Sequence, residues 1–82
     1  MSHNIAVTSF VRPFVNKVYR HYKGGDYKVI AIAHHTETNE QFVVYNNIKQ
    51  ETFIRPIKIW HEIVDYKGEL KPRFTLTQSS SF

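Results

Sequence analysis

Residues 19–35 read YRHYKGGDYKVIAIAHH, and this stretch decides the fold of the 82-residue chain. Gly24-Gly25-Asp26 lies between two runs rich in tyrosine, valine and isoleucine, and such a cluster is a strong signal for a tight turn. After the turn, residues 27–35 carry apolar side chains on both faces of an extended run. This pattern predicts a strand that is buried on both sides, or a barrel strand whose outer face is covered.

Short β-rich runs and turns continue outward from this hairpin. Further strands are predicted at residues 41–46, 52–55 and 73–77, with a turn at 67–69. Pro56 suits the first turn of a helix, and a helical turn from Pro56 to Val64 is expected to close one end. The expected fold class is all-β: a small SH3-like β-barrel or roll of about five short antiparallel strands with one short helical turn.

Three segments are expected along the chain. Residues 1–17 form an N-terminal arm of short apolar pieces broken by Pro13, residues 18–77 form the β-domain, and residues 78–82 form a flexible polar tail. The apolar side chains of the arm are expected to pack on the domain or on a second copy. A protein-protein interaction module, or a homo-oligomer formed through the arm, is therefore one alternative.

Composition limits the classes of function. The chain has no cysteine, so thiolate chemistry and cysteine-based zinc sites are excluded, and a reducing cytoplasm is the expected location. No stretch reaches the roughly 18–20 apolar residues that a membrane span needs, so no membrane partner is expected. Net charge is +4, and residues 12–28 alone carry five basic groups against one acidic group. This uneven charge favours an anionic partner.

The first strand poses a question about its faces. Arg20 and His21 are neighbours, so one of them must point inward with the apolar groups. Burial of a charge is costly unless it is paired. Arg20 either pairs with Glu37 or Glu62 as a structural strut, or lines the mouth of a positively charged pocket.

Catalysis is the weakest of the alternatives. His35 and Glu37 are two residues apart in a predicted turn and could act together in a small hydrolase, or could bind a metal with a third ligand. Neither a metal motif nor a nucleophile elbow is present, so no catalytic residue, metal or cofactor is expected. A simpler role is that Thr36, Glu37 and Thr38 hold the loop by bonds between side chain and backbone.

Basic residues interleaved with aromatic rings give the leading interpretation. Tyrosines can stack on bases while arginines and lysines hold phosphates. Arg55 and Arg73 each stand beside a proline, which lowers the entropy lost when the guanidinium binds. The leading hypothesis is a non-enzymatic module that binds a phosphate-bearing ligand, nucleotide or nucleic acid, through eight residues: Tyr19, Arg20, His21, Lys23, His35, Glu37, Arg55 and Arg73.

The order of the short motifs resembles a small bacterial and phage family, domain of unknown function 1653. The motifs are YRHYKG at 19–24, YKV at 27–29, HTETNE at 35–40, VVY at 43–45, RP at 55–56, Trp60 with Glu62, and PRF at 72–74. Ile59-Trp60 stands where the family usually has Met-Phe. The resemblance implies that the polar residues of these motifs, Glu62 included, are the ones to examine, and it implies no activity.

Overall fold

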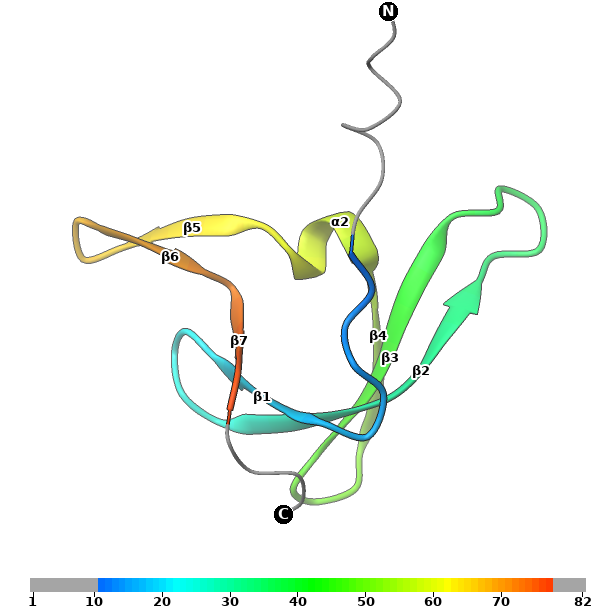
Figure 1. The fold of residues 1–82 in the computed structure, drawn as a ribbon, viewed down its shortest axis with the longest axis horizontal. Coiled ribbons are helices and arrows are strands. Elements are labelled where there is room, and N and C mark those ends of the chain that lie inside the picture. Colours follow the sequence, from blue (N-terminus) through cyan, green and yellow to red (C-terminus); the bar gives the residue numbers. More distant parts are fainter. Residues whose placement is uncertain (1–10, 78–82) are drawn as a thin grey trace, which may run out of the picture.

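The structure is a computed structural model that describes residues 11–77, and this part of the chain holds seven strands and one helical turn (Figure 1). Five antiparallel strands form one sheet in the order β4-β3-β2-β1-β7, so the first and last strands lie side by side. Their bounds are β1 (Val18–His21), β2 (Asp26–His34), β3 (Gln41–Asn47), β4 (Thr52–Pro56) and β7 (Phe74–Leu76).

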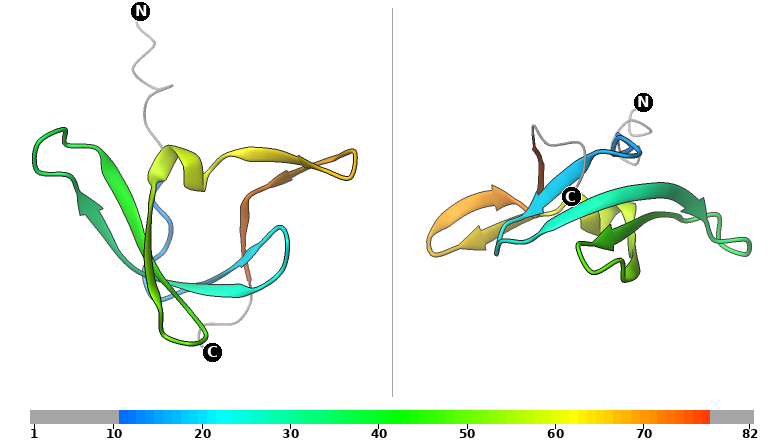
Figure 2. Two further views of the ribbon diagram at one scale, coloured as in Figure 1. Left: turned by 180° about the vertical axis from the view of Figure 1, so that it is seen from behind. Right: turned by 90° about the horizontal axis from the view of Figure 1, so that it is seen from below.

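The remaining strands, β5 (Ile63–Tyr66) and β6 (Glu69–Pro72), form a separate antiparallel hairpin. A helical turn, α2 (Ile57–Trp60), leads into this hairpin from β4. Both views of the molecule show the β5–β6 hairpin on the opposite side from the loop between β2 and β3 (Figures 1 and 2).

The β1–β2 hairpin forms as the sequence predicts. Gly24 and Gly25 have φ angles of 100° and 91°, a region that glycine enters without steric cost. The turn is closed by two backbone bonds: Gly24 N–H donates to the carbonyl of His21 (2.8 Å), and His21 N–H donates to that of Gly25 (3.1 Å). This turn sets the positions of Lys23 and Asp26 next to the end of β1.

β2 is less buried than its apolar sequence predicts. Its pairing with β3 shifts register between Val29 and Ala31, which marks a β-bulge. Val29 is fully buried, whereas Ile30 is 38% exposed. The prediction of a strand buried on both sides is therefore wrong, and most of the strand is half-buried.

One cluster of buried side chains forms the core, and Trp60 and Phe74 stack within it. Their ring centroids are 3.7 Å apart and their planes differ by 5°. This contact joins the end of α2 to the start of β7. The cluster is completed by Tyr19, Val29, Val43, Tyr45 and Ile57.

The all-β class is confirmed, but two details of the expected architecture are wrong. The sheet is open: within residues 11–77, β4 and β7 are its two edges and no closed barrel is formed. The helix from Pro56 to Val64 is also shorter than expected, because the bonds from His61 N–H to Ile57 and from Glu62 N–H to Ile59 end it after one turn. Val64 pairs instead with Lys71 in the β5–β6 hairpin.

Of the expected arm, residues 11–17 are described and the rest lies outside the described residues, as does the expected tail at 78–82. The described part contacts the domain through side-chain and backbone bonds, and Arg12 Nε donates to Gln41 Oε1 at 3.0 Å. Phe14 N–H donates to the hydroxyl of Tyr19 (2.8 Å), and Asn16 N–H donates to the carbonyl of Val29 (2.7 Å).

Trp60→Ala should lower the free energy of unfolding by about 3–5 kcal/mol, because it empties the space beside Phe74. That loss is a large share of the roughly 5–15 kcal/mol that stabilises a domain. Trp60→Phe retains a ring for stacking and should cost clearly less. Urea unfolding followed by circular dichroism measures both variants, and equal losses would contradict the central role of the stack.

Candidate functional site

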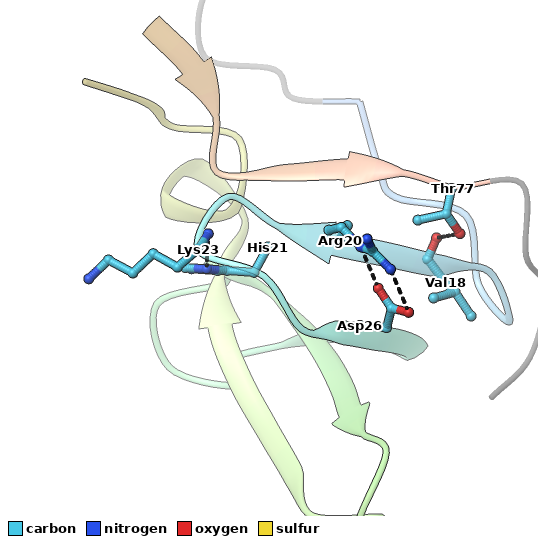
Figure 3. Close-up of polar contacts among 6 residues, drawn as sticks. All are labelled: Val18, Arg20, His21, Lys23, Asp26 and Thr77. Atoms are coloured by element: carbon cyan, nitrogen blue, oxygen red, sulfur yellow. Dashed lines mark hydrogen bonds and ion pairs between the residues drawn. The ribbon is translucent and has the colours of Figure 1, made fainter. Parts of the chain in front are cut away.

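β1 presents His21 to the inner face of the sheet and Arg20 to the outer face. Tyr19, on the same face as His21, is buried at 7% exposure, while Arg20 is exposed. Arg20 pairs with Asp26, with Nε–Oδ1 and NH2–Oδ2 distances of 2.8 and 3.1 Å (Figure 3). The expected pairing of Arg20 with Glu37 or Glu62 is wrong, because Asp26 stands directly opposite Arg20 in the β1–β2 register.

His21 lies at the end of β1 against two aromatic rings. Its ring centroid is 4.6 Å from that of Tyr22 and 5.1 Å from that of Phe74. The backbone N–H of Lys23 donates to His21 Nδ1 at 3.2 Å (Figure 3). Since Nδ1 is an acceptor, the proton of the neutral ring is on Nε2, which becomes a donor.

Positive charge gathers around His21. The pKa of His21 is lowered, first by burial and then by the charges of Arg55, Arg73 and Lys23. Three cationic side chains therefore act on one imidazole, although they come from a turn, from β4 and from the link between β6 and β7. We call these four residues, His21, Lys23, Arg55 and Arg73, the arginine cluster.

Arg55 is held in place by aromatic residues. Its Nε donates to the hydroxyl of Tyr45 at 3.1 Å, and its guanidinium carbon lies 5.7 Å from the centre of the Phe74 ring. Tyr45 and Phe74 are both core residues. The guanidinium is therefore preorganised, which reduces the entropy that it loses when it binds an anion.

Arg73 is partly buried, with a side chain that is 18% exposed. It forms an ion pair with Glu62, and its guanidinium carbon lies 5.9 Å from the centre of the Tyr22 ring. Two backbone bonds fix its position: Arg73 N–H donates to the carbonyl of Glu62 (2.9 Å), and Tyr22 N–H donates to that of Arg73 (3.0 Å). Its Nε is buried and has no hydrogen-bond partner in the described part of the chain.

A groove of about 570 Å³ runs beside the arginine cluster, between β1, β6 and β7. Its lining includes Arg20, His21, Tyr22, Lys71 and Thr75. His21 and Tyr22 both line the groove. His21 is a member of the cluster, and the Tyr22 ring contacts two other members, Lys23 and Arg73. The groove and the cluster thus form one continuous surface at the end of β1.

Other predicted site residues are not brought to this surface. Tyr19 lies in the core, where its ring is 5.4 Å from that of Trp60. His35 and Glu37 lie in the exposed loop between β2 and β3, on the far side of the molecule (Figure 1). There the backbone N–H groups of Glu37 and Thr38 donate to His35 Nδ1, and Thr38 Oγ1 accepts from Glu40 N–H. The side chains of His35 and Thr38 therefore hold this loop, and of the three residues predicted to do so Thr38 is the one confirmed.

Sequence reasoning left Tyr22, Tyr66 and Lys71 out of the eight predicted site residues. Tyr66 and Lys71 belong to the β5–β6 hairpin, which was not predicted. The available signal was the turn at 67–69, because strands on either side of it carry Tyr66 and Lys71 close to the end of β1.

Within residues 11–77, no three His, Cys, Asp or Glu side chains are grouped as a metal site would need. In the same residues, no helix is both long and apolar enough to cross a bilayer.

Fold and surface together define a small all-β domain with one basic, aromatic face. Residues 17–76 match the family model described as a protein of unknown function (DUF1653), and the chain belongs to this family. The crystal structure of a family member from Bordetella bronchiseptica is 38% identical, with a TM-score of 0.67. That match covers 79% of this chain and 85% of the other chain. No curated protein matches the chain.

Acidification should destabilise the fold through His21. The unfolded chain takes up a proton near the ordinary histidine value of 6.5, whereas the folded state, with its lowered pKa, takes it up only at lower pH. The free energy of unfolding should therefore fall as pH drops below 6.5 toward the folded pKa. The slope should be a fraction of the ~1.4 kcal/mol per pH unit of one fully linked proton, since His21 is half-exposed.

Urea unfolding at pH 7.5 and 5.5 measures this effect in the wild type and in His21→Gln. The variant should flatten the pH dependence. His34→Gln is the matched control, because it removes an exposed imidazole at the other end of the sheet. An equal change in both variants would contradict the assignment to the arginine cluster.

Proposed function

We propose that this protein is a non-enzymatic binding module for a phosphate-bearing ligand, a nucleotide or a nucleic acid, and that the arginine cluster holds the phosphate. The observation that carries the proposal is that three cations lie over the two rings that contact His21: Arg55 lies over Phe74, and Arg73 and Lys23 lie over Tyr22. Like charges held together repel one another, and a bound anion offsets that repulsion. A cytoplasmic location belongs to the same proposal.

Local charge balance supports an anionic ligand. Glu62 pairs with Arg73. Among residues 11–77, no other carboxylate forms an ion pair with a member of the cluster, because the remaining ion pairs join Arg20 to Asp26 and Lys71 to Glu69. Three cations against one carboxylate leave a net positive surface. Arginine is suited to it because its planar guanidinium matches the geometry of phosphate oxygens.

Arg73 supplies a second argument. Its buried Nε–H lacks an acceptor among the described residues, and a buried donor without a partner costs about 1–3 kcal/mol. A phosphate oxygen that enters beside Tyr22 and His21 can accept from it. Binding then recovers a hydrogen bond that the free protein lacks.

The hydrolase alternative gains no support from the geometry. His35 Nδ1 accepts two backbone N–H groups, so this nitrogen serves the loop. His35 and Glu37 are both exposed and do not line the groove. A small hydrolase would need a water-excluding site around these two side chains.

Binding should be sensitive to salt, and Arg55 should contribute to it. Fluorescence anisotropy of labelled nucleotides and oligonucleotides over a series of salt concentrations measures the affinity. Arg55→Gln should weaken binding about tenfold and reduce the salt slope by nearly 1, because one phosphate contact is lost. Lys49→Gln, in the exposed turn between β3 and β4, removes the same charge from a remote site and should change little.

A panel that shows no salt-sensitive binding would sink the proposal. So would equal losses in Arg55→Gln and Lys49→Gln, because the effect would then reflect net charge alone. Thermal unfolding of Arg55→Gln checks that the loss of its bond to Tyr45 leaves the fold intact.

A protein-interaction role is the second candidate, and one observation favours it. In the described part of the arm, Val11, Phe14 and Val15 are 79%, 60% and 45% exposed. Apolar side chains gathered on a short segment are typical of a contact surface.

If this segment joins two copies, the double variant Val11→Ser with Phe14→Ser should convert a dimer to a monomer in sedimentation velocity, with nucleotide binding unchanged. A wild type that stays monomeric at high concentration contradicts this role.

A further inference from the structure

We infer that the ligand is a single-stranded nucleic acid, and that it lays at least two successive bases on Tyr22 and Tyr66. This inference rests on the proposed function, since the arginine cluster supplies the phosphate contacts. It goes further by assigning a base-binding role to the β5–β6 hairpin. Three features carry it: the angle between the two rings, the cations around them, and the groove that continues from them.

The two tyrosine rings form separate platforms. Tyr22 follows β1 and Tyr66 ends β5, and their ring centroids are 5.3 Å apart with an interplanar angle of 74°. A planar base stacks parallel to a ring, so one base can lie flat on one of these rings but not on both. Occupation of both platforms therefore requires two bases, which a mononucleotide does not have. Base–aromatic stacking of this kind tolerates any sequence.

Each ring is flanked by two cations. Lys23 Nζ and the Arg73 guanidinium lie 5.7 and 5.9 Å from the centre of the Tyr22 ring. Around Tyr66, Lys67 Nζ and Lys71 Nζ lie 5.2 and 5.7 Å from the ring centre. Four positive groups thus surround two stacking surfaces, which is the arrangement that a chain of alternating bases and phosphates requires.

The present partners of the three lysines are weak enough to be exchanged. A lysine over a partly exposed tyrosine ring gains less than a stacked base does, so the flexible lysines can move from ring to phosphate. Lys71 also pairs with Glu69 at 3.7 Å, but the Glu69 side chain is 73% exposed. An exposed pair of this kind contributes little, and a phosphate oxygen can replace the carboxylate.

The groove gives the strand a path beyond the two rings. Tyr22 and Lys71 line it together with Arg20 and Thr75, which face each other across β1 and β7. A groove that opens along a sheet fits an extended chain, whereas a mononucleotide is typically enclosed on most of its surface. A duplex does not fit the inference, because its bases stack on one another and cannot cover a tyrosine.

Four probes with the same label test the inference: a single-stranded oligonucleotide, its duplex, an abasic chain with the same number of phosphates, and a mononucleotide. The single strand is tested both as DNA and as RNA, which shows which of the two nucleic acids the protein prefers. The wild type should bind the single strand at least tenfold more tightly than any of the other three. This comparison needs no variant. A mononucleotide or an abasic chain that binds as tightly as the single strand overturns the inference.

Tyr66→Leu then tests the hairpin platform. It should weaken binding of the single strand about tenfold, with an unchanged salt slope and unchanged binding of the abasic chain, because a base contact is lost and no phosphate contact is. Tyr66→Phe retains the ring and should keep full affinity. Phe14→Leu removes an exposed ring outside the site and serves as the matched control.

The two proposals fail in different ways. If Arg55→Gln weakens salt-sensitive binding but Tyr66→Leu does not affect the single strand, the inference is overturned and the phosphate site stands. If no probe shows salt-sensitive binding, both are overturned. If Tyr66→Leu weakens the abasic chain as much as the single strand, the hairpin acts through its shape or charge and the stacking role is wrong.

Discussion

Stacking of Trp60 on Phe74 is the contact on which the rest of the structure depends. The chain leaves the main sheet at the end of β4, passes through α2 to Trp60, builds the β5–β6 hairpin and returns to the sheet at Phe74. This one contact therefore joins both ends of the excursion. It also brings Arg73, the residue before Phe74, beside the end of β1, and Arg55 lies over the Phe74 ring. The basic surface is thus assembled by the core and not by local sequence.

Much of the fold could be predicted from local patterns, and the failures have physical causes. The β1–β2 hairpin was predictable because Gly24 and Gly25 accept positive φ angles that other residues resist. The β5–β6 hairpin was missed because Ile57, Trp60 and Val64 also fit the spacing of a helical face. The backbone of Val64 can bond either within a longer helix or to a neighbouring strand. It pairs with Lys71 in the β5–β6 hairpin, so the helix does not continue to this residue.

The site was predictable only in part, for a similar reason. Alternation along β1 shows that Arg20 and His21 point to opposite faces, but it does not show which face is inward. Packing of His21 against Phe74, on the face where Tyr19 is buried, makes the His21 face the inner one, and the ion pair with Asp26 holds Arg20 on the outer face. His35 and Glu37 have the right chemistry but lie in a loop on the far side of the molecule, and local spacing carries no information on such distances.

The backbone bond from Arg73 N–H to Glu62, with the ion pair between the same residues, closes the base of the β5–β6 hairpin. The hairpin between Glu62 and Arg73 projects from the domain, and both of its ends are fixed by these contacts. Loop length carries only a small entropic cost once the ends are joined. A hairpin of another length or composition could therefore be grafted at this position without repacking the core, so the domain carries a replaceable hairpin on a constant base.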